Sequence, residues 1–107
     1  MPKGYVLVTE AITDDAGIAA YERKAAPTMI AAGARILAVD SAPTTLEGEW
    51  HGTRTVLVEF DSVEAAQDWY DSEEYAKAKP LRQAAADCKA VLLTGFEMPK
   101  PRSKPGS

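Results

Sequence analysis

The strongest strand signal in the chain is the stretch TRTVLVEF at residues 53–60, which is followed directly by DSVE at residues 61–64. The first stretch is rich in β-branched and apolar residues, as buried strands are. The second has the spacing of a helix capping box, with Asp61 as the expected N-cap and Glu64 at the third helical position. A strand that passes straight into a helix is therefore the unit around which the rest of the chain is arranged.

Working outward from this unit, three further strand patterns and two helical regions are found. Strands are expected at residues 5–10, 35–39 and 90–96. The first helix should begin at the acidic segment 13–15 and end before Gly33, and Pro27 should kink or divide it. The second helical region follows the capping box. Within it, Ser72 should cap a new piece of helix and Pro80 should restart the helix.

The predicted order of elements is β-α-β-β-α-β, which is typical of the ferredoxin-like α+β fold. We expect a four-stranded antiparallel sheet with the helices on one face. The 107 residues suit a single domain, which we place at residues 1–97. Residues 98–107 are basic and rich in proline, and they are expected to form a disordered tail.

Both faces of the expected sheet are apolar. Alternate side chains of a strand point to opposite sides, so Val56, Val58 and Phe60 share one side while Leu57 and Glu59 share the other. The first strand is also largely apolar on both sides. Because the helices cover only one face, the other needs a second cover, and pairing with a copy of the same chain is the simplest one. We therefore expect a homodimer.

Charge and composition narrow the possible partners. A net charge of −4 argues against a nucleic-acid surface. No apolar run is long enough to cross a membrane, and the first residues do not resemble a signal peptide. Cys88 is the single cysteine, so neither an intrachain disulfide nor a cysteine cluster for zinc is possible. These features favour a cytoplasmic location, with no membrane or nucleic-acid partner, and we expect neither a metal nor a cofactor.

Several segments form a recognisable set: KGY at residues 3–5, Tyr21 with Pro27, LEGEW at residues 46–50, VEF at residues 58–60, WYDSEEY at residues 69–75 and KPLR at residues 79–82. Taken together, they resemble the small bacterial family named domain of unknown function 1330. The resemblance spans nearly the whole chain and implies a dimeric α+β barrel, and hence a homodimer. It implies no established activity, because the wider superfamily includes cofactor-free monooxygenases, enzymes like muconolactone isomerase and haem-degrading enzymes.

The candidate catalytic residues are Glu59, Arg82 and Tyr21. Glu59 stands among apolar strand residues, and burial inside the barrel would raise its pKa and suit it for proton transfer. Arg82 offers a fixed guanidinium fork, and either Arg82 or a tyrosine hydroxyl such as that of Tyr21 would stabilise a developing oxyanion. The alternative is that Glu59 pairs with Arg82 or Arg54 and has only a structural role.

Five further residues are candidates for binding a small ligand. Trp50 and His51 follow acidic residues in a loop, where the histidine is either a proton shuttle or simply solvated. Tyr70, Ser72 and Tyr75 offer hydroxyl groups at a break between helical pieces. There they either line the mouth of a pocket or cap the break.

Two functions remain open from the sequence. The first is a cofactor-independent enzyme that transfers a proton on a small organic molecule such as a lactone, quinone or polyketide fragment, in an isomerase-like or monooxygenase-like reaction at the dimer barrel. The second is a non-catalytic homodimer that binds a small ligand or serves as a scaffold, in which the same residues only close the interface.

Overall fold

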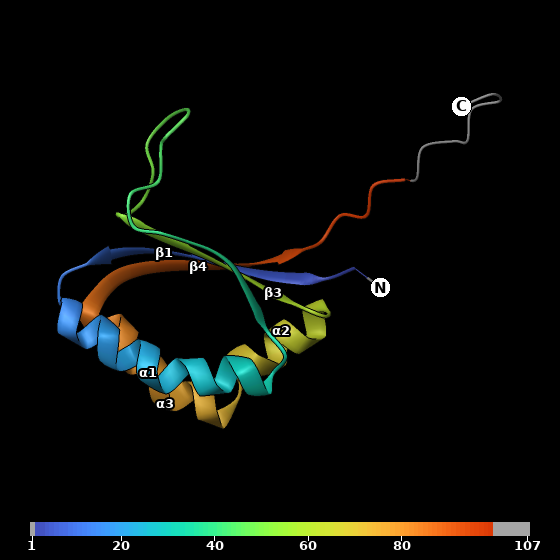
Figure 1. Ribbon diagram of the computed structural model, residues 1–107, viewed down its shortest axis with the longest axis horizontal. Coiled ribbons are helices and arrows are strands. Elements are labelled where there is room, and N and C mark those ends of the chain that lie inside the picture. The colour runs from blue at the N-terminus through green and yellow to red at the C-terminus, as the bar shows by residue number, and fades with distance from the viewer. Residues whose placement is uncertain (1, 100–107) are drawn as a thin grey trace.

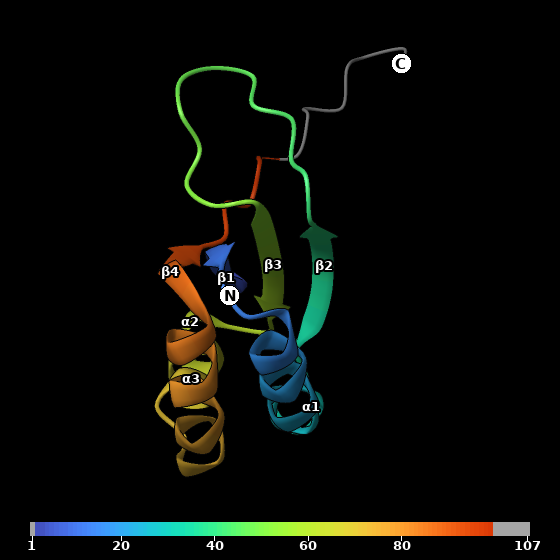
Figure 2. The ribbon, with the colours of Figure 1, turned by 90° about the vertical axis from the view of Figure 1, so that its left-hand side faces the viewer.

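The first strand, β1 (Gly4–Ile12), lies in the interior of the sheet. In the computed structural model, which describes residues 2–99, it is followed by α1 (Asp15–Ala31), β2 (Arg35–Asp40), β3 (Arg54–Phe60), α2 (Val63–Tyr70), α3 (Glu73–Ala85) and β4 (Ala86–Thr94). The strands are arranged in the order β2-β3-β1-β4, and every pairing is antiparallel. All three helices lie against one face of the sheet (Figures 1 and 2).

This arrangement confirms the predicted α+β fold, a four-stranded antiparallel sheet with helices on one face. The chain leaves β1 through α1 to the edge strand β2, returns through β3, and then crosses under the sheet through α2 and α3 to reach the opposite edge at β4. The homodimer stays a prediction. Residues 100–107, which make up most of the expected tail, lie outside the described residues.

The core lies between the sheet and the helices. Val58 and Phe60 of β3 are fully buried there, which confirms the predicted side for these two residues. The ring of Trp69 lies 5.3 Å from that of Phe60 and 4.0 Å from that of Tyr75, measured between centroids. Burying side chains of this size contributes roughly 1.5–3 kcal/mol each, so this aromatic cluster is a principal reason why α2 and α3 stay on the sheet.

The caps of the two short helices differ in how well the sequence predicted them. Ser72 caps α3 as expected, since its Oγ accepts from the N–H of Tyr75 at 3.1 Å. Asp61, however, is not the N-cap of α2. Ser62 takes that place and accepts from the N–H of Ala65 at 3.0 Å, while the carboxylate of Asp61 accepts from Arg35 at 3.0 Å.

Pro27 lies inside α1 without dividing it. The hydroxyl of Thr28 donates to the carbonyl of Ala25 at 2.6 Å, so a side chain satisfies a carbonyl close to the missing proline N–H. The helix ends as predicted at Gly33, whose φ of +72° lies in the left-handed region. Its N–H donates to Ile30 at 3.0 Å, which closes a Schellman-type end.

Two further boundaries differ from the prediction. Pro80 does not restart a helix but lies inside α3, which runs unbroken to Ala85 because its buried face packs along α1. Strand β4 then starts at Ala86, earlier than the expected residue 90, and it ends at Thr94. Cys88 is therefore a strand residue, paired with β1, and not the end of a helix.

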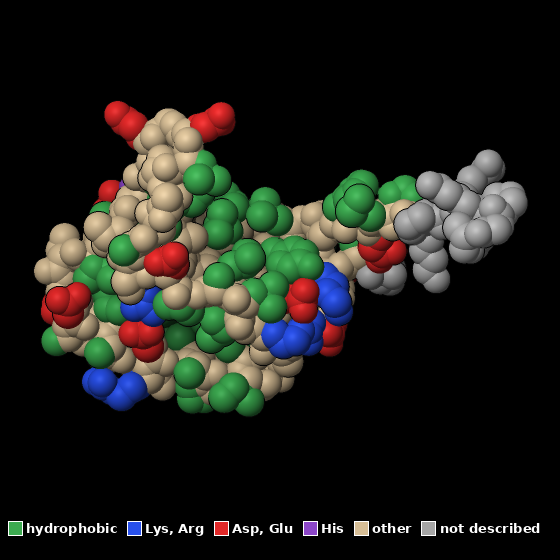
Figure 3. Space-filling model, turned by 45° about the horizontal axis from the view of Figure 1, so that its top comes forward, with side chains coloured by type: hydrophobic (Ala, Val, Ile, Leu, Met, Phe, Trp, Pro, Cys, Tyr) green, Lys and Arg blue, Asp and Glu red, His purple; other side chains and the backbone are tan. Residues whose placement is uncertain are grey.

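The helix-free face of the sheet carries an apolar stripe. In register across β3, β1 and β4, it consists of Leu57, Leu7 and Val91, with Leu93 alongside. Val91 is 50% exposed. Hydrophobic side chains gather over this face in Figure 3, beneath the loop that joins β2 to β3. Among residues 2–99, no helix is long and apolar enough to span a membrane, and the cytoplasmic location stays a prediction.

Candidate functional site

A row of polar side chains crosses the helix-covered face of the sheet. Glu10 of β1 pairs in register with Arg54 of β3 and with Cys88 of β4. Glu10 is only 3% exposed, and its Oε1 lies 3.5 Å from Nε of Arg54. Arg54 also donates from Nη2 to Oε2 of Glu22 on α1 at 2.7 Å. The fold thus holds a carboxylate in its interior, next to one guanidinium.

Three side chains from the helices face this row. The hydroxyl groups of Tyr21 on α1 and Tyr75 on α3 are 2.9 Å apart and buried. The guanidinium carbon of Arg82 lies 6.0 Å from the centre of the Tyr21 ring, and Tyr75 and Cys88 lie beside the guanidinium. We call the whole set the buried polar row: Glu10, Tyr21, Arg54, Tyr75, Arg82 and Cys88.

Burial governs the protonation of this row. It raises the pKa of Glu10 above the ordinary 4.5, although the charges of Arg54 and Arg82 oppose the rise. A carboxyl group whose pKa is raised by burial is a candidate to take up and release a proton in a reaction. Burial, together with the Tyr75 contact, also raises the pKa of Tyr21. The Tyr21 hydroxyl therefore stays protonated, and either it or the Tyr75 hydroxyl donates in the hydrogen bond between them.

An apolar pocket of about 120 Å³ opens beside the row, between α1 and strands β2 and β3. We call it the α1 pocket. Its walls are mostly aliphatic side chains together with the Trp69 ring, and they include Val6, Val8, Ala25, Met29, Val56 and Val58. The polar lining residues are Glu10, Tyr21, Arg54 and Glu22, the last of which is the partner of Arg54. An apolar cavity with a few convergent polar groups is the usual form of a small-molecule site.

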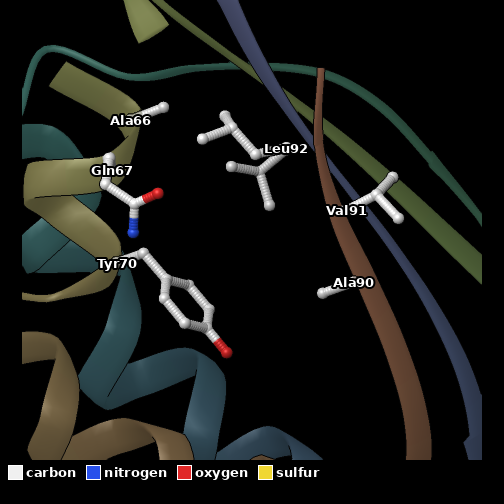
Figure 4. A pocket seen from close by; sticks show the side chains of 7 residues that line it. Ala66, Gln67, Tyr70, Ala90, Val91 and Leu92 are labelled. Atoms are coloured by element: carbon white, nitrogen blue, oxygen red, sulfur yellow. The ribbon is translucent and has the colours of Figure 1, made fainter. Parts of the chain in front are cut away.

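Two more open hollows lie on the other side of the row, along β4. One, of about 210 Å³, separates α2 from β4, and Figure 4 shows Tyr70 and Gln67 facing the strand across it. The other, of about 350 Å³, is lined by Arg82 and Cys88 among others. The two hollows share Tyr70 and Ala90, so they adjoin each other.

Glu59 does not belong to the buried polar row. It lies on the helix-free face, where Arg35 Nε donates to its Oε1 at 2.7 Å and the Tyr5 hydroxyl donates to its Oε2 at 3.0 Å. The hydrogen bond from Arg35 lowers the pKa of Glu59, helped by that from Tyr5. In the single chain the shift in the pKa of Glu59 is thus opposite to the rise expected from burial in a dimer barrel. An ion pair was the alternative, but the partner is Arg35 and neither Arg54 nor Arg82.

Trp50 and His51 also lie on the helix-free face. Trp50 Nε1 donates to the Thr55 hydroxyl at 2.8 Å. The Nδ1 atom of His51 lies 2.6 Å from the Thr9 hydroxyl, and its Nε2 lies 3.2 Å from Asp87 Oδ2. The imidazole is thus not simply solvated. It holds the loop between β2 and β3 against the sheet, on the face opposite to the α1 pocket.

The remaining predicted residues take separate places. Tyr70 lines both hollows along β4, and the ammonium group of Lys79 lies 4.0 Å from its ring centre. Ser72 caps α3. Tyr75 joins the buried polar row through its hydroxyl. Of the eight predicted site residues, the structure brings only Tyr21, Tyr75 and Arg82 together in that row.

The sequence analysis missed Glu10, although a signal for it was present. Val6, Val8 and Glu10 are alternate residues of one strand, and the first two are apolar. Once that side is known to face the helices, Glu10 must be buried. Within residues 2–99, no group of three His, Cys, Asp or Glu side chains is placed to hold a metal ion.

A family model described as Domain of unknown function (DUF1330) matches residues 3–96 of the chain. No curated protein matches it. Among solved structures, the RPA0582 protein of unknown function from Rhodopseudomonas palustris is similar, with a TM-score of 0.75 and 20% identity. The match covers 91% of this chain and 85% of that chain.

Two other solved structures share the fold at lower identity. SnoaB, a cofactor-independent oxygenase from Streptomyces nogalater, has a TM-score of 0.65 and 8% identity, over 94% of this chain and all of that chain (100%). A dimeric protein of unknown function with a ferredoxin-like fold from Bacteroides fragilis has a TM-score of 0.57 and 11% identity, over 86% and 95% of the two chains. At these identities the likeness establishes the fold alone.

Proposed function

This chain belongs to the family described as Domain of unknown function (DUF1330), and we propose that it is a homodimeric enzyme that acts without a cofactor on a small organic molecule in the α1 pocket. The observation that carries the proposal is the carboxylate of Glu10. It is buried in the lining of a mostly apolar pocket, and burial raises its pKa. Carboxyl groups with raised pKa values in a pocket mark candidate sites of proton transfer.

The size of the pocket limits the substrate. A cavity of about 150 Å³ is large enough for benzene, and the α1 pocket measures about 120 Å³. A single ring, with part of the molecule extending through the mouth between α1 and β2, therefore fits best. Of the compounds expected from the sequence, a lactone or monocyclic quinone suits this space better than a fused polyketide.

Glu10 would take a proton from a saturated carbon next to the carbonyl group of a lactone ring. The electron pair of the broken C–H bond moves toward the carbonyl oxygen, which becomes an enolate. Arg54 Nε has no hydrogen-bond partner among the described residues and would donate to this oxygen, and a shift of the Tyr21 hydroxyl from Tyr75 would add a second donor. Returning the proton at another carbon completes an isomerisation.

An oxygenase-like outcome is the second candidate reaction at the same site. In place of being reprotonated, the electron-rich enolate carbon would form a C–O bond with dioxygen, and the resulting peroxide anion would take up the proton held by Glu10 to give a hydroperoxide. The likeness to SnoaB, a cofactor-independent oxygenase, favours this alternative. The two outcomes differ in stoichiometry, since only the oxygenation consumes dioxygen.

The homodimer would form through the helix-free face. Leu7 and Leu57 lie there beside the half-exposed side chains of Val91 and Leu93, and a monomer would leave this stripe in water. The similar Bacteroides fragilis protein is dimeric. Because the sheet separates the α1 pocket from this face, each protomer would hold its own complete pocket.

The test begins with a thermal-shift screen of single-ring lactones, quinones and phenols. Each hit that has a saturated C–H next to a carbonyl group, as the lactones do, is then incubated with the protein in D₂O, and incorporation of deuterium is followed by NMR. We expect Glu10→Gln to bind a hit but to slow exchange by about 10²–10⁴-fold, which is what a general base contributes. The matched control, Glu59→Gln, should retain both binding and exchange.

Three results would count against an enzyme built on Glu10. Exchange that is equally fast in Glu10→Gln would remove the residue from the reaction, and loss of exchange only in Glu59→Gln would move the site to the other face. Binding by the wild type with no exchange and no dioxygen uptake would favour the non-catalytic ligand-binding homodimer.

A further inference from the structure

Arg82 is a buried cation without a carboxylate partner. The residue is 3% exposed, and no Asp or Glu oxygen of residues 2–99 lies within ion-pair distance of it. Its Nε has no hydrogen-bond partner among the described residues, and the neutral side chains of Tyr75 and Cys88 lie beside the guanidinium. A buried charge is costly unless it is paired and hydrogen-bonded, so this guanidinium has capacity for an anion.

A ligand from solvent can approach Arg82. Its side chain lines the hollow of about 350 Å³ between α3 and β4, which opens to solvent on the side away from the α1 pocket. Glu10 feels the charge of Arg82, but its ion pair is with Arg54. The anion for Arg82 must therefore come from outside the chain.

We propose that the groove along β4 binds an organic monocarboxylate, with its carboxylate on the Arg82 guanidinium and its apolar body in the adjoining hollow between α2 and β4. This site is distinct from the α1 pocket and does not depend on the proposed reaction there. The guanidinium fork matches a carboxylate in shape and in charge.

The surroundings of Arg82 select for this class of ligand. Asp87 lines the same hollow, and its negative charge disfavours a dianion such as phosphate. Tyr70 and Ala90 line both hollows, so they connect the charged end of the groove to the end formed by Val6 and Leu92. Figure 4 shows the ring of Tyr70 standing beside this passage. A ligand with one negative charge and an apolar body would use both ends.

The single cysteine of the chain provides a reporter for the site. Cys88 lines the hollow next to Arg82 and is partly exposed. A bound carboxylate should therefore shield it from iodoacetamide. The readout is the ratio of alkylation rates without and with the probe, because removing Arg82 also changes the intrinsic reactivity of the thiol.

The probes are benzoate, the neutral benzamide of the same shape and inorganic phosphate, at equal ionic strength. Benzoate should slow alkylation of the wild type by about tenfold near saturation, as expected for occupancy of roughly nine-tenths, and benzamide and phosphate should protect little. Arg82→Met should abolish protection by benzoate, whereas Arg23→Met, which removes an exposed arginine of α1, should preserve it.

The proposal is overturned if benzamide or phosphate protects as well as benzoate, or if folded Arg82→Met keeps the protection. A buried charge without a partner is costly, and Arg82→Met removes it while keeping a side chain that fills the space, so we expect this variant to fold. Should it fail to fold, Ala90→Leu carries the test. It narrows the passage between the hollows and should weaken protection by benzoate, and unchanged protection would overturn the proposal.

Discussion

At the scale of residues, the environment of two glutamates decides their chemistry. Glu10 and Glu59 both lie in strands and both have a nearby arginine. Glu10 faces the core, where desolvation raises its pKa. Glu59 faces the helix-free side, where hydrogen bonds from Arg35 and Tyr5 lower its pKa. The same side chain is therefore a candidate proton carrier at one position and half of an ion pair at the other.

These opposite shifts predict opposite effects of pH on stability. The stabilisation by Glu59 is present above its unfolded pKa and is lost as pH falls through its lower folded pKa, so Glu59→Gln should lose more stability at pH 7 than in acid. Glu10 has a raised folded pKa, so its ionised form disfavours folding. As pH rises through that pKa the wild type loses stability, and Glu10→Gln should therefore become more stable relative to the wild type. Urea unfolding of both variants and the wild type from pH 3 to 7 measures this. Parallel pH profiles would contradict the two assignments.

At the scale of elements, the sequence predicts helix boundaries correctly where only neighbouring residues determine them. The cap at Ser72 depends on its own hydroxyl and the following turn, and it was predicted. The cap of α2 was placed one residue too early, because Asp61 and Ser62 are both good N-caps and Arg35, distant in sequence, contacts Asp61. Pro80 was misjudged for a similar reason, since the packing of α3 against α1 outweighs its local preference.

The cap of α3 gives a prediction at this scale. Ser72→Ala removes the acceptor for the Tyr75 N–H and the donor to the Trp69 carbonyl. It should lower the free energy of unfolding by about 1 kcal/mol. Chemical denaturation of this variant, with the exposed loop change Ser41→Ala as the control, measures the difference. Ligand binding in the α1 pocket should be unchanged, and a selective loss of binding with full stability would give Ser72 the ligand role expected from the sequence.

At the scale of the whole molecule, the two faces of the sheet differ in the side chains that they carry. The helix-covered face holds the buried polar row and the α1 pocket, while the other carries the apolar stripe. The alternation of β3 predicted both faces, and the fold followed from the order of elements. Only Tyr21, Tyr75 and Arg82 of the buried polar row were predicted as site residues. Glu10 joins them because segments distant in sequence pack together, and no local sequence pattern specifies that packing.

The apolar stripe predicts how the molecule assembles. The wild type should be a dimer of about twice 11.5 kDa at micromolar concentration. Leu7→Glu places a charge in the centre of the stripe and should yield a folded monomer, because a charge buried at an interface is not compensated. Ile30→Glu changes an exposed side chain of α1 and should leave the dimer intact. Light scattering distinguishes the species, and a monomeric wild type would refute the proposed interface.

The central claim is that Glu10 is a buried carboxyl group poised for proton transfer. Its most direct test is a ¹³C NMR titration of the glutamate side-chain carboxyl groups, with the signals assigned from Glu10→Gln and Glu59→Gln. The structure predicts that Glu10 titrates above the ordinary value of 4.5 and that Glu59 titrates below it. A Glu10 carboxyl that titrates at or below 4.5 would contradict the account.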